Sequence, residues 1–227
     1  MVWLAIIPSI VLFIMIWRKD KIEKEPAGLL IKLLLFGALT TVSAGVIGMS
    51  AQYLLLNFLD EKSMVFIVID NFLLTALVEE GGKYFVLKKA TWKHPAFNYT
   101  FDAVVYAVCS SLGFATLENI LYLIDGDLGT AVGRGLLSVP GHVIFAVFMG
   151  YYYGMAKYAS VGGDDRGCRS NLRKALWVPV LLHGMYDFCL STGYDAFLVV
   201  FIVFVVVMSV LAIRKVRNMS KNDNMIS

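Results

Sequence analysis

The chain has 227 residues, of which 59% are hydrophobic and 16% are charged. A soluble domain of this length normally carries a larger charged fraction, so the composition excludes an ordinary soluble globular protein. The net charge of +3 is explained by the distribution of basic residues around a membrane, and we expect no nucleic-acid partner. These features predict an integral membrane protein.

Seven apolar segments are candidates for membrane-spanning helices, because a bilayer core about 30 Å thick requires about 20 helical residues. They cover residues 2–17, 29–59, 64–87, 101–124, 130–158, 175–190 and 197–213. No tandem repeat is visible, and the longest polar connection, residues 160–174, is too short to form a second domain. We therefore predict an all-α membrane protein, a polytopic transmembrane helix bundle of about seven spans that forms a single domain over residues 1–227.

Basic residues alternate between connections. They gather in residues 18–24, 88–93, 157–174 and 214–221, whereas the connections around residues 60–62, 125–129 and 192–195 contain Lys62 as their only basic residue. Cytoplasmic connections of membrane proteins are enriched in lysine and arginine. The pattern predicts a multi-pass protein of the cell membrane, with the N-terminus outside and the C-terminus in the cytoplasm.

The third predicted span contains the sequence Glu79-Glu80-Gly81-Gly82-Lys83. On a helix, Lys83 lies one turn after both carboxylates, so it can neutralise one of them while the other stays available. The alternative is that the span ends early and that these residues form a solvated helix terminus. The apolar residues that follow Lys83 favour a position within the membrane.

The next two spans each contribute one ionisable group. Phe114-x-x-x-Glu118 places an aromatic ring and a carboxylate on one helix face, with Asn119 next to it; alternatively, Glu118 lies near the outer rim of the membrane. His142 follows Pro140-Gly141, a pair expected to loosen the helix where the backbone lines a cavity. A histidine that merely bonds a neighbouring helix is the competing interpretation.

The sixth span contains His183-x-x-x-Asp187. A carboxylate at this spacing can orient an imidazole and raise its basicity, although a purely structural hydrogen bond is also compatible with it. An ionisable group at the bilayer centre costs about 2.5 to 3.5 kcal/mol and usually serves function. Counting about 1.5 Å per residue puts Glu79 and Glu118 at different depths, so a shared site requires tilted spans or shifted boundaries.

These four motifs, over about residues 70–190, together with the strings at 113–122 and 182–188, resemble the PrsW family of bacterial membrane proteases. The resemblance implies an intramembrane protease of the bacterial cell membrane. It also implies site-1 cleavage of a single-span anti-sigma factor on the outer side, which begins the release of an extracytoplasmic-function sigma factor. The family is distantly similar to CAAX-processing endopeptidases, whose corresponding motifs end in histidine and asparagine where this chain has Glu118 and Asp187.

Peptide hydrolysis by these residues would use water as the nucleophile, because no serine or cysteine accompanies a histidine in the motifs. We expect Glu79 to act as general base, with its reactivity set by Glu80 and Lys83. His142 and Glu118 would hold the water or pass protons, and His183, fixed by Asp187, would stabilise the oxyanion. Lys83, Phe114 and Asn119 are expected to support the site.

Three alternatives stay open at this level. No cofactor is expected for a glutamate-type peptidase, but the same residues suit a divalent metal such as zinc, with Glu79, Glu118, His142 and His183 as ligands; the sequence H-E-x-x-H is absent. A proton-coupled transporter would favour inverted repeats, which are not visible. A membrane adaptor would use the polar groups for packing alone. The expected partners are the lipid bilayer and a single-span anti-sigma factor or another membrane protein.

Overall fold

The structure is a computed structural model that describes residues 2–125 and 128–226, and helices account for most of these residues. In chain order they are α1 (Val2–Trp17), α2 (Ala27–Leu55), α3 (Met64–Ile69), the π-helix η1 (Asp70–Ala76), α4 (Leu77–Thr91), α5 (Asp102–Asp125), α6 (Leu128–Val161), α7 (Asp165–Ser191) and α8 (Asp195–Lys221). No β-strand occurs within the described ranges, and the predicted all-α fold is confirmed.

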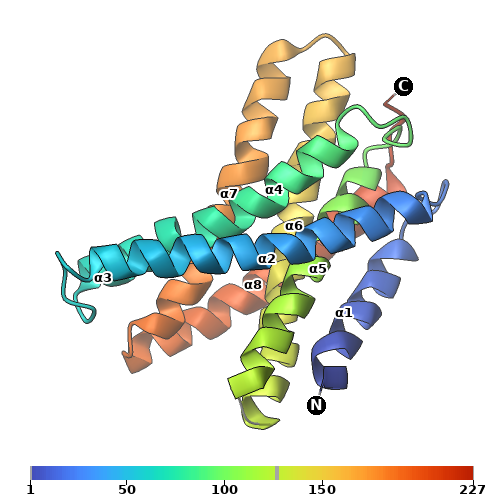
Figure 1. Cartoon of the computed structure of the whole chain (residues 1–227). Coiled ribbons are helices and arrows are strands. Elements are labelled where there is room, and N and C mark those ends of the chain that lie inside the picture. The colour runs from blue at the N-terminus through green and yellow to red at the C-terminus, as the bar shows by residue number, and fades with distance from the viewer. Residues whose placement is uncertain (1, 126–127, 227) are drawn as a thin grey trace.

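The seven predicted spans correspond to seven helical stretches, because α3, η1 and α4 follow one another without a break (Figure 1). Within the described residues, four helices are long and apolar enough to cross a membrane, namely Ala27–Leu55, Asp102–Ile124, Val132–Val161 and Asp195–Lys221. The segments containing Glu79 and His183 are less apolar because they carry the ionisable residues of the predicted site. On α8, Val199, Ile202 and Val206 are more than half exposed, as suits contact with lipid.

The crossing of α2 and α5 depends on two glycines. A methyl group on Gly37 would lie 2.0 Å from the carbonyl oxygen of Ser110, and one on Gly113 would lie 2.0 Å from that of Leu34. Only glycine allows the two backbones to approach this closely, which is a common means of helix association in lipid. At Gly45, by contrast, an added methyl group would meet nothing within 4 Å.

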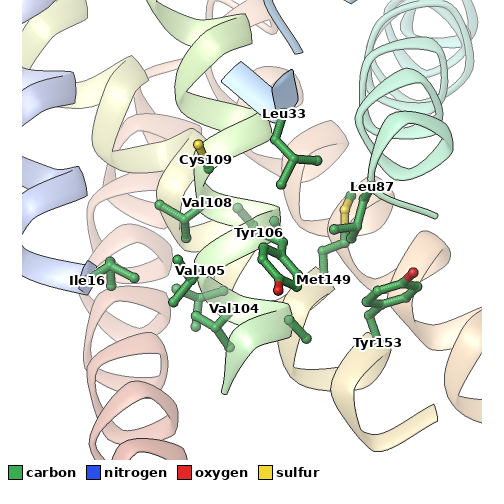
Figure 2. Close-up of a cluster of buried hydrophobic side chains, with 14 of the residues drawn as sticks. Ile16, Leu33, Leu87, Val104, Val105, Tyr106, Val108, Cys109, Met149 and Tyr153 are labelled. Carbon is green, nitrogen blue, oxygen red and sulfur yellow. The ribbon is translucent and has the colours of Figure 1, made fainter. Parts of the chain in front are cut away.

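Helix α5 forms the centre of the hydrophobic core. Figure 2 shows its buried side chains among residues contributed by α1, α2, α4 and α6. The labelled members are Ile16, Leu33, Leu87, Val104, Val105, Tyr106, Val108, Cys109, Met149 and Tyr153. Because α5 is covered on several sides, it holds Glu118 in a fixed position within the bundle.

The helices are inclined to one another. In Figure 1, α2 and α4 run across the molecule, whereas α1 and α5 lie at a steep angle to α2. With 29 residues, α2 is about 43 Å long and exceeds a bilayer core of about 30 Å unless it tilts or extends beyond it. This inclination resolves the expected difference in depth, because Glu79 of α4 and Glu118 of α5 line the same cavity.

Hydrogen bonds join the basic connections at one end of the bundle. The Lys157 ammonium donates to the carbonyl of Trp92 at 2.8 Å, and the Thr100 amide donates to the carbonyl of Asn224 at 3.0 Å. The Ser220 hydroxyl donates to the carbonyl of Lys19. These contacts place the four basic connections near one another at the same end of the bundle, and the side of the membrane that they face stays a prediction. Of the predicted outer connection 125–129, residues 126–127 lie outside the described residues.

Candidate active site

The helix that carries the paired glutamates begins at Ser63, whose hydroxyl accepts the Phe66 amide at 3.1 Å and caps α3. Its middle part is the π-helix η1, and such turns recur at functional sites. Phe72 of η1 packs directly on Gly184 of α7, where a methyl group would come within 2.4 Å of the ring. This close contact brings α4 beside the part of α7 that contains His183.

Lys83 lies at the centre of the site. Its Nζ is 2.7 Å from Glu80 Oε1, 3.4 Å from Glu79 Oε2 and 3.1 Å from His142 Nδ1. The ammonium also lies 3.9 Å from the centre of the Phe114 ring. Lys83 is 1% exposed and Glu80 is fully buried, and α4 continues to Thr91. The paired glutamates are therefore inside the bundle, which excludes the solvated helix terminus.

Each imidazole is held by a carboxylate on the side away from Lys83. His142 Nε2 lies 3.1 Å from Glu118 Oε2, and His183 Nε2 lies 3.1 Å from Asp187 Oδ2. The Nδ1 atom of His183 is 3.1 Å from Glu80 Oε1. The two rings lie 5.3 Å apart and nearly perpendicular to each other. Carboxylates at Nε2 fix the orientation of both rings, with Nδ1 of His142 directed toward Lys83 and Nδ1 of His183 directed toward Glu80.

Glu118 has a second partner that the motifs did not reveal. Arg134 Nη2 lies 2.6 Å from Glu118 Oε2, and its Nε donates to Asn119 Oδ1 at 3.0 Å. The guanidinium also lies 3.7 Å from the centre of the Tyr122 ring. The sequence did offer an indication that Arg134 belongs to the site, because an arginine within a predicted span is as unusual as a glutamate there. Arg134 and His142 therefore share one carboxylate oxygen of Glu118, Oε2, which fixes the position of this side chain.

A cavity of about 380 Å³ opens onto these groups. Of the predicted site residues, its lining includes Glu79, Glu118, His142, His183 and Asp187. The other predicted residues, namely Glu80, Lys83, Phe114 and Asn119, lie behind this lining and are buried. The two adjacent glutamates thus differ, because the Glu79 side chain is 12% exposed whereas that of Glu80 is 0% exposed.

The structure brings all four motifs together, as the sequence predicted. One local expectation was wrong, because α6 continues through Pro140 as a single helix from Leu128 to Val161. Pro140 has no backbone amide, so one hydrogen bond of the helix is missing there. Packing against neighbouring helices keeps α6 continuous. Phe145, one turn after Gly141, stacks on the His183 ring with centroids 5.0 Å apart, a contact that the sequence did not indicate.

The residues fit a divalent metal ion by their donor chemistry. Ligand atoms of Glu79, Glu80, His142 and His183 all lie within 4.8 Å of one another. Glu80 Oε2 is buried and has no hydrogen-bond partner among the described residues. A buried carboxylate oxygen without a partner is suited to bind a cation. The group includes Glu80, whereas the sequence suggested Glu118 as the fourth ligand. Glu118 instead contacts Nε2 of His142 at 3.1 Å.

Comparisons with known proteins find relatives along most of the chain. A family profile described as PrsW family intramembrane metalloprotease matches residues 25–213. The protein named Protease PrsW from Geobacillus kaustophilus is 37% identical over 186 residues, which are 82% of this chain and 77% of that relative. The Clostridioides difficile protein of the same name is 34% identical over 225 residues, with 96% and 92% coverage, and that of Bacillus subtilis is 36% identical over 191 residues, with 82% and 81% coverage.

No solved structure matches the chain significantly. The family assignment therefore depends on sequence similarity along most of the chain, together with the convergence of the four motifs on one cavity. Both agree with the resemblance that the motifs predicted. The chain belongs to the PrsW family of intramembrane proteases.

Proposed function

We propose that the chain hydrolyses a peptide bond of a membrane-anchored protein with water bound in the cavity, and that Glu79 is the general base. The difference between the paired glutamates carries this proposal. Glu80 is fully buried and contacts Lys83 and His183, whereas Glu79 lines the cavity. A base must lie within hydrogen-bond reach of the proton that it accepts, and of the two only the Glu79 carboxylate can contact water there.

The other groups have separate roles in this proposal. As water adds to the peptide carbonyl, its proton passes to Glu79 and negative charge develops on the carbonyl oxygen. His183, oriented by Asp187 at 3.1 Å from Nε2, stabilises that oxygen by donating from Nδ1, which must exchange its contact with Glu80 Oε1 at 3.1 Å for the substrate oxygen. Cleavage of the carbon–nitrogen bond then requires a proton on the leaving amine, which Glu79 returns. His142 and Glu118 hold the water in the orientation that attack requires.

A metal-dependent version of the same protease uses the same cavity. Glu79, Glu80, His142 and His183 would hold the ion, which when bound supplies Lewis-acid polarisation and activation of water. Lys83 Nζ now contacts His142 Nδ1 at 3.1 Å, so this imidazole can become a ligand only if the ammonium moves away. The family description as a metalloprotease supports this version.

The proposed substrate is a single-span anti-sigma factor, following the resemblance of the motifs, in a cell membrane where the C-terminus faces the cytoplasm. The test is purified protein reconstituted in vesicles with a candidate single-span substrate. Glu79→Gln should lower turnover by about 10²–10⁴-fold, because it removes the base and keeps the shape. The matched control is Glu61→Gln, which changes an exposed glutamate in a connection outside the cavity.

Metal content is measured on the same preparations, before and after treatment with a chelator. Loss of turnover on chelation and recovery with Zn²⁺ would establish the metal-dependent version. Full turnover by metal-free protein would establish the glutamate-type version. Normal turnover by Glu79→Gln would refute Glu79 as the base of the glutamate-type version and as a ligand in the metal-dependent version.

A further inference from the structure

A second cavity lies on the other side of α6. It has a volume of about 430 Å³ and is formed by α1, α6 and α8. Most of the side chains that line it are apolar, among them Leu12, Ile16, Val143, Val147, Ile213 and Val216. None of its lining residues lines the active-site cavity. We call this cavity the α1–α8 groove.

Two basic side chains distinguish the groove from the remaining lipid-facing surface. Lys19 follows the end of α1, and Arg217 lies in the last part of α8; both line the groove. Their positions are close in space, because the Ser220 hydroxyl donates to the carbonyl of Lys19. Both residues are exposed, and neither side chain forms an ion pair or hydrogen bond with other residues in the described ranges.

The groove is thus apolar along its length and positively charged at one end. That end also carries the other basic connections of the bundle, including Arg18 and Arg214. A ligand that matches this arrangement has an apolar chain and an anionic head. Arginine binds phosphate oxygens through two parallel N–H donors, and lysine adds a positive charge.

We propose that the α1–α8 groove is a binding site for an anionic phospholipid, with an acyl chain in the groove and its phosphate against Lys19 and Arg217. The apolar wall alone gives little selectivity, because a lipid chain gains no hydrophobic free energy by moving from the bilayer into an apolar groove. The charged end therefore decides which lipid binds. Each basic residue near anionic lipid should raise the affinity about fivefold.

The experiment titrates the purified full-length protein in detergent micelles with phosphatidylglycerol or with zwitterionic phosphatidylcholine and counts bound lipids by native mass spectrometry. The wild type should bind one phosphatidylglycerol with at least tenfold preference over phosphatidylcholine. The variant Lys19→Gln/Arg217→Gln should lose about 25-fold in affinity for phosphatidylglycerol, the product of two fivefold effects. Both residues are exposed, so a thermal unfolding midpoint close to that of the wild type is expected.

The matched control is Arg18→Gln/Arg214→Gln, which removes the same charge from the same end of the bundle but outside the groove. It should change the affinity by less than threefold. A second variant, Ser209→Trp, fills the groove from α8 without altering any charge, and it should also abolish the tight binding. Equal binding of the two lipids by the wild type, or equal losses in the two double variants, would overturn the proposal.

Discussion

Removing the central ammonium should be the most damaging single change for the stability of the site. Lys83 is 1% exposed and contacts Glu80 at 2.7 Å and Glu79 at 3.4 Å. Lys83→Met keeps the length of the side chain but leaves buried carboxylates without their cation. Loss of one partner from a buried ion pair typically costs about 3–5 kcal/mol.

A loss of this size is readily measured. For a chain of this length, each kcal/mol shifts the thermal midpoint by about 2–4 °C, so Lys83→Met should unfold roughly 6–20 °C below the wild type. The assay is thermal unfolding in detergent micelles. Lys62→Met serves as the control, because this exposed residue lies in a connection, and a surface change of this kind stays within about 0.5 kcal/mol.

A double variant separates charge from packing. Glu80→Gln/Lys83→Met removes both members of the 2.7 Å pair, so the buried charge that remains is the same as in the wild type. It should be more stable than Lys83→Met by about 0.5–3 kcal/mol, the range of coupling energies for groups in one network. If Lys83→Met unfolds within 2 °C of the wild type, or if the double variant is no better, the ion pair does not stabilise the site.

Three further predictions concern other parts of the chain. Gly113→Ala should destabilise the protein by about 1–3 kcal/mol, because the methyl group would overlap a backbone oxygen of α2. Asp187→Asn should lower kcat about 10–100-fold with little change in KM, because His183 loses the carboxylate that orients it. Burial raises the pKa of Glu25, in the connection between α1 and α2, to about 7. The folded protein therefore binds this proton more tightly than the unfolded chain, and the contribution of Glu25 to stability falls as the pH rises from about 4 through 7.

Each of these predictions has a matched control. Gly45→Ala meets no neighbouring atom and should be neutral or slightly stabilising in the thermal assay; equal effects at both glycines would refute the packing argument. Asp195→Asn, at the start of α8, should leave kcat unchanged, and an equal loss there would show that Asp187 has no special role. Glu25→Gln should flatten the fall of stability with pH, whereas Glu23→Gln should not.

The sequence predicted the helices and the ionisable groups that the structure brings into contact, because ionisable groups within apolar segments are rare enough to stand out one by one. The catalytic roles of these groups stay predictions. The contacts between them depend on tertiary structure. The role of Arg134 illustrates the limit, since its partners Glu118 and Asn119 are on another helix. The inclination of α2 to α5 was equally hidden, because helix crossing angles depend on packing at positions such as Gly37 and Gly113.

The difference between Glu79 and Glu80 could not be read from the sequence either. Two adjacent residues on a helix point about 100° apart, but the pattern does not show which of them faces a cavity. In the structure, Glu80 is directed toward His183 and Lys83, while Glu79 reaches the cavity. Packing of η1 against Gly184 places α7 beside α4 and so selects which carboxylate is enclosed.

The charge of the site explains why metal content is the decisive measurement. The contacting side chains comprise four carboxylates, those of Glu79, Glu80, Glu118 and Asp187, and two basic groups, Lys83 and Arg134. With neutral imidazoles, four negative and two positive charges leave a net charge of −2.

Such a charge is costly within a bilayer, so two further positive charges must complete the site. His142 stays neutral beside the Lys83 ammonium, because its Nδ1 accepts from Nζ at 3.1 Å. A proton on His183, which lies between Glu80 and Asp187 at 3.1 Å from each, and a second proton on one of the carboxylates would provide the two charges, and so would one divalent ion. The two versions of the proposed protease thus differ in which cation balances the same four carboxylates. One equivalent of metal in active protein indicates the ion, whereas active protein without metal indicates the protons.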